Sequence, residues 1–265
     1  MSHSELDDHA YVIASGASAT DRLELLAEVF APITKSFLER IGRVDSFLDV
    51  GCGLASVATE VMNAGAARVV AADINAEVIE AARQRTPAMC VVASVDELGN
   101  EPLTDFDVVY ARCVLSHLPD PVAALTRMTG ASKPGGLVAV EDVQVARVWS
   151  APPLTALQRH VDLYVQAARI MGASPDLAQH LPEHMSSAGL TDISVTVLQP
   201  LLTTARARSI YAVTMNAIGD AVVGAGLATA DEVDSLTRQL ASAARSDSWY
   251  VTLPLVVQVT GRIPY

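Results

Sequence analysis

Two glycines and two acidic residues carry the strongest chemical signal in the sequence. Gly51 and Gly53 lie in the segment FLDVGCGLAS at 47–56, where a short apolar run changes into a helical pattern. A glycine-rich turn between a strand and a helix lets the backbone approach a ligand closely, and it leaves free N–H groups at the start of the helix. Asp49 precedes the first glycine by two residues, and Asp73 follows about twenty residues further on.

The position of Asp49 favours a ligand with a cationic or amine group over one with a pyrophosphate. In the dinucleotide-binding form of this turn a third glycine would stand at Ser56, and no acid is expected beside the strand end. Asp73 ends a second buried run, where an acid commonly hydrogen-bonds ribose hydroxyls. A plain tight turn at the glycines and a simple helix cap at Asp73 are the alternatives.

Composition and charge argue against several classes of function. The chain has 265 residues, of which 51% are hydrophobic, and a formal net charge of −12. Because it has no basic run, it gains no counterion-release affinity for nucleic acid or an anionic membrane. Cys52, Cys90 and Cys113 lie far apart and form no CxxC pair, which favours buried thiols over disulfides or zinc. With no signal-peptide pattern and no membrane-spanning run, we expect a cytoplasmic protein without nucleic-acid or membrane partners.

Hydrophobic periodicity predicts the elements that position these residues. The predicted strands are 47–50, 68–73, 88–92, 106–113, 137–143, 193–198 and a long antiparallel strand at 249–259. The first five alternate with helices and are rich in buried apolar residues, as in a parallel sheet that is covered on both faces. The expected fold class is α/β, with a doubly wound, mostly parallel, seven-stranded sheet.

Four motifs in order resemble one known family. The segments LDVGCG, AADIN, FDVVYARCVLSHLPDP and KPGGLVAVED are similar to those of the class I S-adenosylmethionine-dependent methyltransferases, particularly the small-molecule branch of the ubiquinone and menaquinone type. Each motif is common, whereas the four in this order and spacing are specific. The KPGG and HLPDP segments separate the chain from nicotinamide-binding relatives. The resemblance covers residues 45–145 closely, and it implies S-adenosyl-L-methionine as cofactor and a small molecule as substrate.

The resemblance also implies a set of cofactor contacts. Asp49 would accept from the amine of the methionine part, and Asp73 would hold both ribose hydroxyls. The family often places an acid near the adenine amino group; here that position is Ser94, so either Ser94 or Asp96 would serve. The third glycine of the loop is replaced by Ala55, a minor departure. The implied cofactor-binding residues are Asp49, Gly51, Gly53, Asp73, Ile74, Ser94, Val95, Asp96, Ala111 and Arg112.

Three residues are candidates for the chemistry of methyl transfer. His117, just beyond the fourth strand, is the candidate general base, and Arg112 is placed to pair with a carboxylate. Glu141 and Asp142 end the fifth strand on opposite faces, and the family pattern favours Asp142 in the site. The alternatives are a loop-capping histidine, an ion pair between Arg112 and an acid of the lid, and a structural carboxylate.

Helices outside the core are predicted to cover the ligand. Apolar residues recur at helical spacing over 20–42, with a break at Pro32. We interpret the chain as one structural domain in three parts: an N-terminal lid at 1–44, the cofactor-binding core at 45–145, and at 146–265 the rest of the sheet with substrate-cap insertions at 146–174 and 205–246.

The candidate substrate contacts come from the lid, the end of the fourth strand and the cap, and are Tyr11, His117, His160, Tyr164, Tyr211 and Met215. Their chemistry indicates a fairly apolar small molecule, and ordinary core packing is the alternative. No metal site is predicted, because Pro182 interrupts the spacing between His180 and His184. No acid follows the fourth strand either, which argues against a magnesium-dependent mechanism.

Together these observations predict a methyltransferase that acts on a small, partly apolar metabolite such as a natural-product intermediate. O-methylation is the first expectation, and N- and C-methylation are open. Two alternatives keep the fold: an enzyme that binds S-adenosylmethionine but catalyses a non-methylating cyclisation, and a non-catalytic binding module. A homodimer is left open as the oligomeric state.

Overall fold

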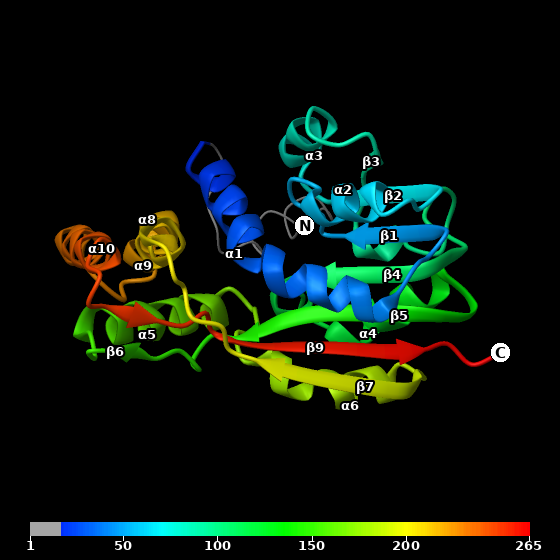
Figure 1. Ribbon diagram of the computed structural model, residues 1–265. Coiled ribbons are helices and arrows are strands. Elements are labelled where there is room, and N and C mark those ends of the chain that lie inside the picture. Colours follow the sequence, from blue (N-terminus) through cyan, green and yellow to red (C-terminus); the bar gives the residue numbers. More distant parts are fainter. Residues whose placement is uncertain (1–16) are drawn as a thin grey trace.

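One mostly parallel sheet forms the centre of the molecule (Figure 1). The computed structural model describes residues 17–265, and within them the sheet has seven strands. These are β1 (Ser46–Val50), β2 (Arg68–Asp73), β3 (Met89–Val92), β4 (Phe106–Arg112), β5 (Ser132–Gln144), β7 (Thr191–Leu198) and β9 (Leu255–Arg262). Their order is β3-β2-β1-β4-β5-β9-β7, with β1 to β5 parallel and β9 antiparallel to both neighbours. The predicted fold class is confirmed.

Short local signals explain where the helices of the core begin. The connecting helices are α2 (Ser56–Asn63), α3 (Ala76–Arg83) and α4 (Pro121–Gly130). Asn75 accepts hydrogen bonds from the N–H groups of Glu77 and Val78, and Asp120 accepts from the N–H of Ala123. Both residues therefore satisfy donors that the first turn of a helix leaves unpaired, as the sequence predicts.

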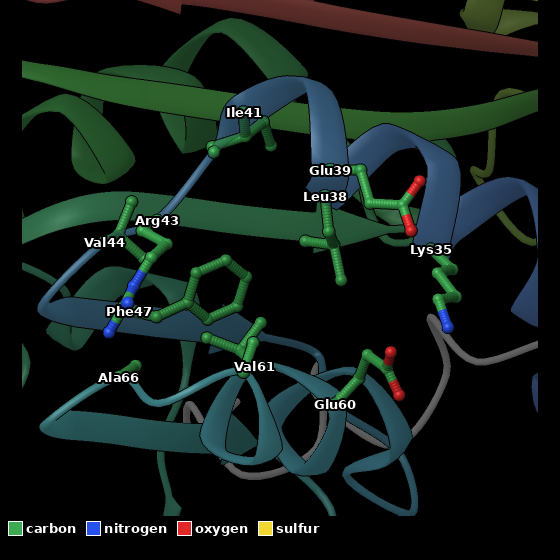
Figure 2. Close-up of a pocket in the computed structure, with 12 residues that line it drawn as sticks. Lys35, Leu38, Glu39, Ile41, Arg43, Val44, Phe47, Glu60, Val61 and Ala66 are labelled. Carbon is green, nitrogen blue, oxygen red and sulfur yellow. The ribbon is translucent and has the colours of Figure 1, made fainter.

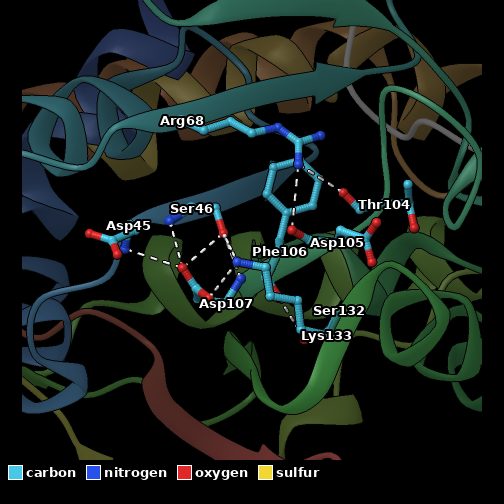
Figure 3. Close-up of polar contacts among 9 residues, drawn as sticks. All are labelled: Asp45, Ser46, Arg68, Thr104, Asp105, Phe106, Asp107, Ser132 and Lys133. Carbon is cyan, nitrogen blue, oxygen red and sulfur yellow. Dashed lines mark hydrogen bonds and ion pairs between the residues drawn. The ribbon is translucent and has the colours of Figure 1, made fainter.

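The start of the sheet is locked by a polar cluster at the amino ends of four neighbouring strands (Figure 3). The Asp107 carboxylate accepts from the Ser46 N–H at 2.7 Å and forms an ion pair with Lys133 at 2.8 Å. Burial raises the pKa of Asp107, but the hydrogen bonds from Lys133 and Ser46 outweigh it, so the net shift is downward. Arg68 lies 4.2 Å from the Phe106 ring centroid and donates to the Thr104 carbonyl. This cluster fixes the strands in register, so their carboxyl ends meet at the opposite edge.

The KPGG segment and the last predicted strand differ from expectation. The segment 133–136 belongs to the irregular first part of β5, where the register with β4 shifts, rather than forming a separate turn. The predicted strand at 249–259 is two strands, β8 (Tyr250–Val251) and β9, because Pro254 between them has no N–H to donate. β8 pairs with β6 (Ser150–Ala151) in a small separate ladder.

A helical cap stands beyond the carboxyl ends of the central strands (Figure 1). It is built from α5 (Thr155–Ile170), α7 (Ala205–Arg208), α8 (Ile210–Ala217), α9 (Gly219–Gly224) and α10 (Ala230–Ala244). Its apolar side chains share one buried cluster that includes Leu163, Met215 and Leu240. The remaining short helices are η3 (Val95–Glu97), η4 (Leu115–His117), η5 (Leu177–His180) and α6 (Leu181–Ser187). None of the helices described in residues 17–265 has the length and apolar character needed to cross a bilayer.

The lid helix α1 (Ala17–Ile41) joins the cap to the core, because it contacts α2 on one side and α7 and α8 on the other. The predicted break at Pro32 is wrong: the helix continues through this residue. Pro32 is exposed, so its ring meets no packed neighbour, while Phe30, Thr34 and Phe37 bury the opposite face. Tertiary packing of that face overrides the missing hydrogen bond.

Replacing Pro32 with alanine should raise the free energy of unfolding by about 2 kcal/mol. Proline costs about 3 kcal/mol in a helix interior, and it offsets about 1 kcal/mol of this by lowering the conformational entropy of the unfolded chain. Urea denaturation measures the change. Pro121→Ala is the matched control, since Pro121 occupies the first turn of α4, where proline is favourable, and this variant should lose about 0.5 kcal/mol. A loss of stability in Pro32→Ala would show that the lid needs proline at this point.

Candidate cofactor and substrate site

The glycine loop adopts a left-handed backbone that explains its sequence. Gly51, Gly53 and Ala55 have φ of +63°, +54° and +58°. A Cβ added at Gly51 would lie 2.3 Å from Cγ2 of Val114, so no larger residue fits there, whereas one at Gly53 would only touch the Leu23 side chain at 3.6 Å. Ala55, expected to be a minor departure, is fully buried and takes a strained conformation that glycine would adopt freely.

Asp73 ties this loop to the end of β2. One carboxylate oxygen accepts from the Gly53 N–H and the other from the Asn75 N–H, both at 3.0 Å. Burial raises the pKa of Asp73, and these backbone donors oppose the rise. A carboxylate offers about four lone-pair sites, so both oxygens can still accept from a ligand. Asn75 rather than Asp73 caps α3, which removes the simple-cap alternative for Asp73.

Asp49 is a buried carboxylate that accepts a hydrogen bond from the Ala58 N–H at 3.2 Å. Burial raises its pKa to about 7, and the charge of Arg112 limits that rise. A carboxylate in this state is stabilised by a nearby cation, because the charged form is the one that burial disfavours. The structure thus supports the sequence argument that the loop suits a ligand with an amine.

Arg112 connects the end of β4 to the two helices above it. Its guanidinium donates to the Thr34 hydroxyl on α1 at 3.1 Å and to the Ser56 hydroxyl on α2 at 3.2 Å, and it lies 5.5 Å from the Phe30 ring centroid. Within the described residues it forms no ion pair with an acid of the lid; hydroxyl groups take that place.

Glu141 and Asp142 face opposite sides of β5, as alternation along a strand requires. Glu141 accepts from the Tyr110 hydroxyl at 2.9 Å and from the Thr34 hydroxyl at 3.2 Å. Asp142 accepts from the N–H groups of Ser116 and Val143, and burial raises its pKa to about 6. Both carboxylates are fully buried, and Asp142 holds η4, the turn that carries His117. A role for Asp142 in the reaction stays a prediction.

His117 lies on η4, which begins directly after Val114, the residue that packs against Gly51. Burial, together with the smaller effect of the charge of Arg22, lowers the pKa of His117 to about 4. The imidazole is therefore neutral at physiological pH, the form that a proton acceptor requires. His117 lies just beyond β4, as predicted, and its catalytic role stays a prediction.

The residues expected near adenine behave differently from one another. Ser94 caps η3 in a reciprocal capping box with Glu97, which the pattern S-x-x-E in the sequence also indicates. The Asp96 side chain is 80% exposed and lies 4.0 Å from Arg127. Ile74, directly after Asp73, is 54% exposed, so it can cover a flat ligand. The adenine contacts of Ile74, Ser94, Val95 and Asp96, and the contact from the buried Ala111, stay predictions.

The predicted cap residues come together in the structure. His160 is buried, with Nδ1 3.4 Å from the Met215 sulfur and its ring 5.8 Å from that of Tyr211. The Tyr211 hydroxyl donates to the Thr252 carbonyl, and Tyr164 lies next to His160. All four belong to the core of the cap, and contact with a substrate stays a prediction. Tyr11 lies outside the described residues.

Two polar residues of α1 were missed by sequence reasoning. Arg22 and Thr34 are both buried on the face that also carries Leu26 and Phe30. The positions 22, 26, 30 and 34 are four apart, so all four residues share one helix face. The sequence signal for Arg22 and Thr34 is their position as polar residues within an apolar stripe, because polar groups that are buried need partners.

A surface pocket of about 340 Å³ lies between α1 and α2 at the other end of β1 (Figure 2). Leu38, Phe47 and Val61 point into it, with Lys35 and Glu60 to one side. Ligands of doubly wound sheets bind outside the carboxyl ends of the strands, where the order reverses. That point is between β1 and β4, at the glycine loop, and the pocket of Figure 2 contains none of its residues.

Comparison with known proteins identifies a family match over the part of the chain that contains the glycine loop. Residues 48–140 match the family described as "Methyltransferase domain". This part of the chain is therefore similar to a methyltransferase domain, in agreement with the resemblance of its motifs to the class I S-adenosylmethionine-dependent methyltransferases. The domain includes every predicted cofactor residue, from Asp49 to Arg112.

Curated relatives cover only part of the chain. The ubiquinone biosynthesis O-methyltransferases of Xanthomonas campestris pv. campestris (strain B100) and Xanthomonas axonopodis pv. citri (strain 306) are each 36% identical over 94 residues. Those residues make up 34% of this chain, and the chain spans 39% of the length of these relatives.

Solved structures share the fold of the methyltransferase domain at low identity. Phosphoethanolamine N-methyltransferase 2 of Haemonchus contortus, in complex with phosphomonomethylethanolamine and S-adenosylhomocysteine, has a TM-score of 0.58 and 18% identity. That match covers 94% of this chain and 58% of the other. A putative methyltransferase of Bacillus halodurans has a TM-score of 0.54 and 16% identity, covering 87% and 98% of the two chains.

The residues at the glycine loop fit S-adenosylmethionine. Gly51 and Gly53 let the backbone approach a ligand, Asp73 has acceptor capacity left, and buried Asp49 suits an amine. The glycines would let the cofactor lie against the loop backbone, Asp73 would hold its ribose, and Asp49 would hold the amine of its methionine part.

The geometry of the glycine loop predicts that alanine destabilises the protein more at position 51 than at position 53. Gly53→Ala should lower the free energy of unfolding by about 1–2 kcal/mol, the cost of a left-handed alanine. Gly51→Ala should lower it by more than about 3 kcal/mol, because its Cβ also overlaps the stiff Val114 side chain. Urea denaturation of both variants measures the difference, and equal losses would contradict this geometry.

Proposed function

We propose that this protein transfers a methyl group from S-adenosylmethionine to an oxygen atom of a small, partly apolar acceptor. The observation that carries the proposal is the Asp73 carboxylate, which joins the glycine loop to the end of β2 beside the buried Asp49. Similarity over residues 48–140 to a methyltransferase domain supports the transfer. The O-methyltransferase relatives support oxygen as the accepting atom.

When bound, S-adenosylmethionine supplies a methyl group on a sulfonium, which is already activated for in-line displacement. The chain must therefore align the acceptor and exclude water. α1 covers the strand ends through Leu23, which faces Gly53, and Thr34, which bonds Glu141. The apolar cluster of the cap supports an acceptor with an apolar body.

His117 is the proposed proton acceptor for the hydroxyl group. Its neutral imidazole takes the proton as the oxygen attacks, and it needs no prior deprotonation above about pH 5 because its pKa is about 4. An imidazole of such low basicity suits an acidic hydroxyl, such as a phenol, better than an aliphatic alcohol. Asp142 positions His117 through the Ser116 N–H.

Calorimetric titration with S-adenosylhomocysteine tests the cofactor part of the proposal. Wild type should bind this ligand, and Asp73→Ala should bind it at least about tenfold more weakly, because two hydrogen bonds from ribose to a carboxylate are lost. Asp45→Asn is the matched control, since Asp45 is exposed at the amino end of β1, far from the loop along the strand. Absence of binding to wild type would refute the proposal.

Mass spectrometry of reactions with S-adenosylmethionine and a panel of phenols tests the transfer. A product that gains one methyl group is expected, and His117→Asn should lower kcat by about 100-fold or more without changing the affinity for S-adenosylhomocysteine. The wild-type rate should stay flat from pH 5 to 8 on the His117 side, since the group titrates near pH 4. A variant as fast as wild type would remove His117 from the mechanism.

A further inference from the structure

Arg22 is a buried cation in the wall between the lid and the cap. Its side chain is on α1, and the residue is only 7% exposed. Its Nε donates to the Thr214 hydroxyl on α8 at 3.4 Å, a long contact for this type of bond. In the part of the chain that the structure describes, no acid forms an ion pair with its guanidinium.

Three titratable groups on which the charge of Arg22 acts are uncharged at physiological pH. The charge of Arg22 acts on His117 at η4, on His160 of α5 and on the Cys113 thiol at the end of β4. Burial lowers the pKa of both histidines to about 4 and raises that of the thiol, so all three groups are neutral at physiological pH. Among the described residues, neither these three groups nor the Thr214 hydroxyl gives Arg22 a counterion.

A guanidinium that is buried without a counterion destabilises a protein unless something compensates for its lost hydration. The exposed ion pairs of α1, such as Glu28 with Arg206, differ from buried Arg22 because water already screens their charges. A ligand with a negative group is the compensation that this site lacks.

The orientation of Arg22 points to the acceptor rather than to the cofactor. Leu23, the next residue of α1, faces Gly53 of the glycine loop. Successive helix residues differ by about 100° in direction, so Arg22 points to another side of α1 than Leu23, and its Nε contacts Thr214 of α8. Arg112, not Arg22, is the cation that acts on Asp49 at the loop.

We propose that Arg22 binds a carboxylate on the acceptor, so that the substrate class is an apolar, hydroxylated organic acid. The inference rests on the proposed methyl transfer and specifies the acceptor of that same site. The planar guanidinium can take a carboxylate through two parallel hydrogen bonds, which fixes orientation as well as charge. Bound in this way, the acid end of the acceptor lies on the side of the cap, close to Thr214 and His160.

The test uses matched carboxylate and amide probes with the full chain in saturating S-adenosylhomocysteine. The pairs are 4-hydroxybenzoate with 4-hydroxybenzamide, 4-hydroxycinnamate with its amide, and decanoate with decanamide. Calorimetry should show at least one carboxylate that binds wild type about tenfold or more tightly than its amide, since hydrogen bonds to charged groups are among the strongest. Arg22→Met should abolish this preference. Arg22→Lys keeps the charge but cannot form the two parallel hydrogen bonds, so it should retain part of the preference.

Two further readouts separate binding from a structural role. Arg22→Met should unfold at the same temperature as wild type or higher, because methionine removes an uncompensated buried charge. Its affinity for S-adenosylhomocysteine should stay within about twofold of wild type. Arg206→Met is the control variant. It breaks the exposed ion pair between Arg206 of α7 and Glu28 of α1, and it should keep the carboxylate preference.

Four results would overturn the inference. These are no carboxylate preference in wild type for any pair, a preference that survives in Arg22→Met, a tenfold weaker affinity of that variant for S-adenosylhomocysteine, or a clear fall in its unfolding temperature. The third would assign Arg22 to the cofactor, and the fourth would make it a structural residue. Failure of wild type to bind S-adenosylhomocysteine at the outset would instead refute the proposed function.

Discussion

The charge of Arg112 makes it feasible to bury several acidic groups at one edge of the sheet. Asp49 at the end of β1 and Glu141 at the end of β5 both have pKa values raised by burial, and in both the guanidinium is the largest opposing influence. Its hydrogen bonds run to Thr34 and Ser56, so the same side chain also fastens α1 and α2 over the strand ends. Without it, both carboxylates would be protonated over a wider range of pH, and the lid would lose a polar anchor.

This arrangement explains how a rigid sheet can present a ligand site under a lid. The polar cluster around Asp107 sets the register at the amino ends of β1, β4 and β5. The strand ends then lie at fixed positions, and the glycine loop, Asp73 and η4 follow from them. α1 contacts α2 of the core and α7 and α8 of the cap, so residues on its different faces reach both parts of the molecule.

Local chemistry allowed much of this to be predicted from the sequence. The glycine loop, the acid at the end of β2 and the helix caps at Asn75 and Asp120 depend on neighbours within a few residues, so their patterns are visible in the chain. The parallel direction of the first five strands followed from their alternation with helices, whereas the order of the strands was not predicted.

What could not be predicted depends on contacts between distant residues. The continuation of α1 through Pro32 results from packing of the opposite face, which no local propensity reports. The pairing of Glu141 with Tyr110 and Thr34 joins residues up to 107 positions apart. Sequence reasoning favoured Asp142 and did not identify Thr34 or Arg22, because the lid was interpreted as an apolar stripe with polar residues outside it.

The buried Asp49 carboxylate needs a cationic partner to stay charged. Because burial raises its pKa to about 7, about half of the Asp49 side chains carry a proton at pH 7, and a bound amine would displace it. Calorimetric titration with S-adenosylhomocysteine at pH 7, in two buffers with different ionisation enthalpies, measures the protons exchanged. We predict a net release of about half a proton per bound ligand in wild type and none in Asp49→Asn. Binding without proton release, or equal release in both proteins, would contradict the account.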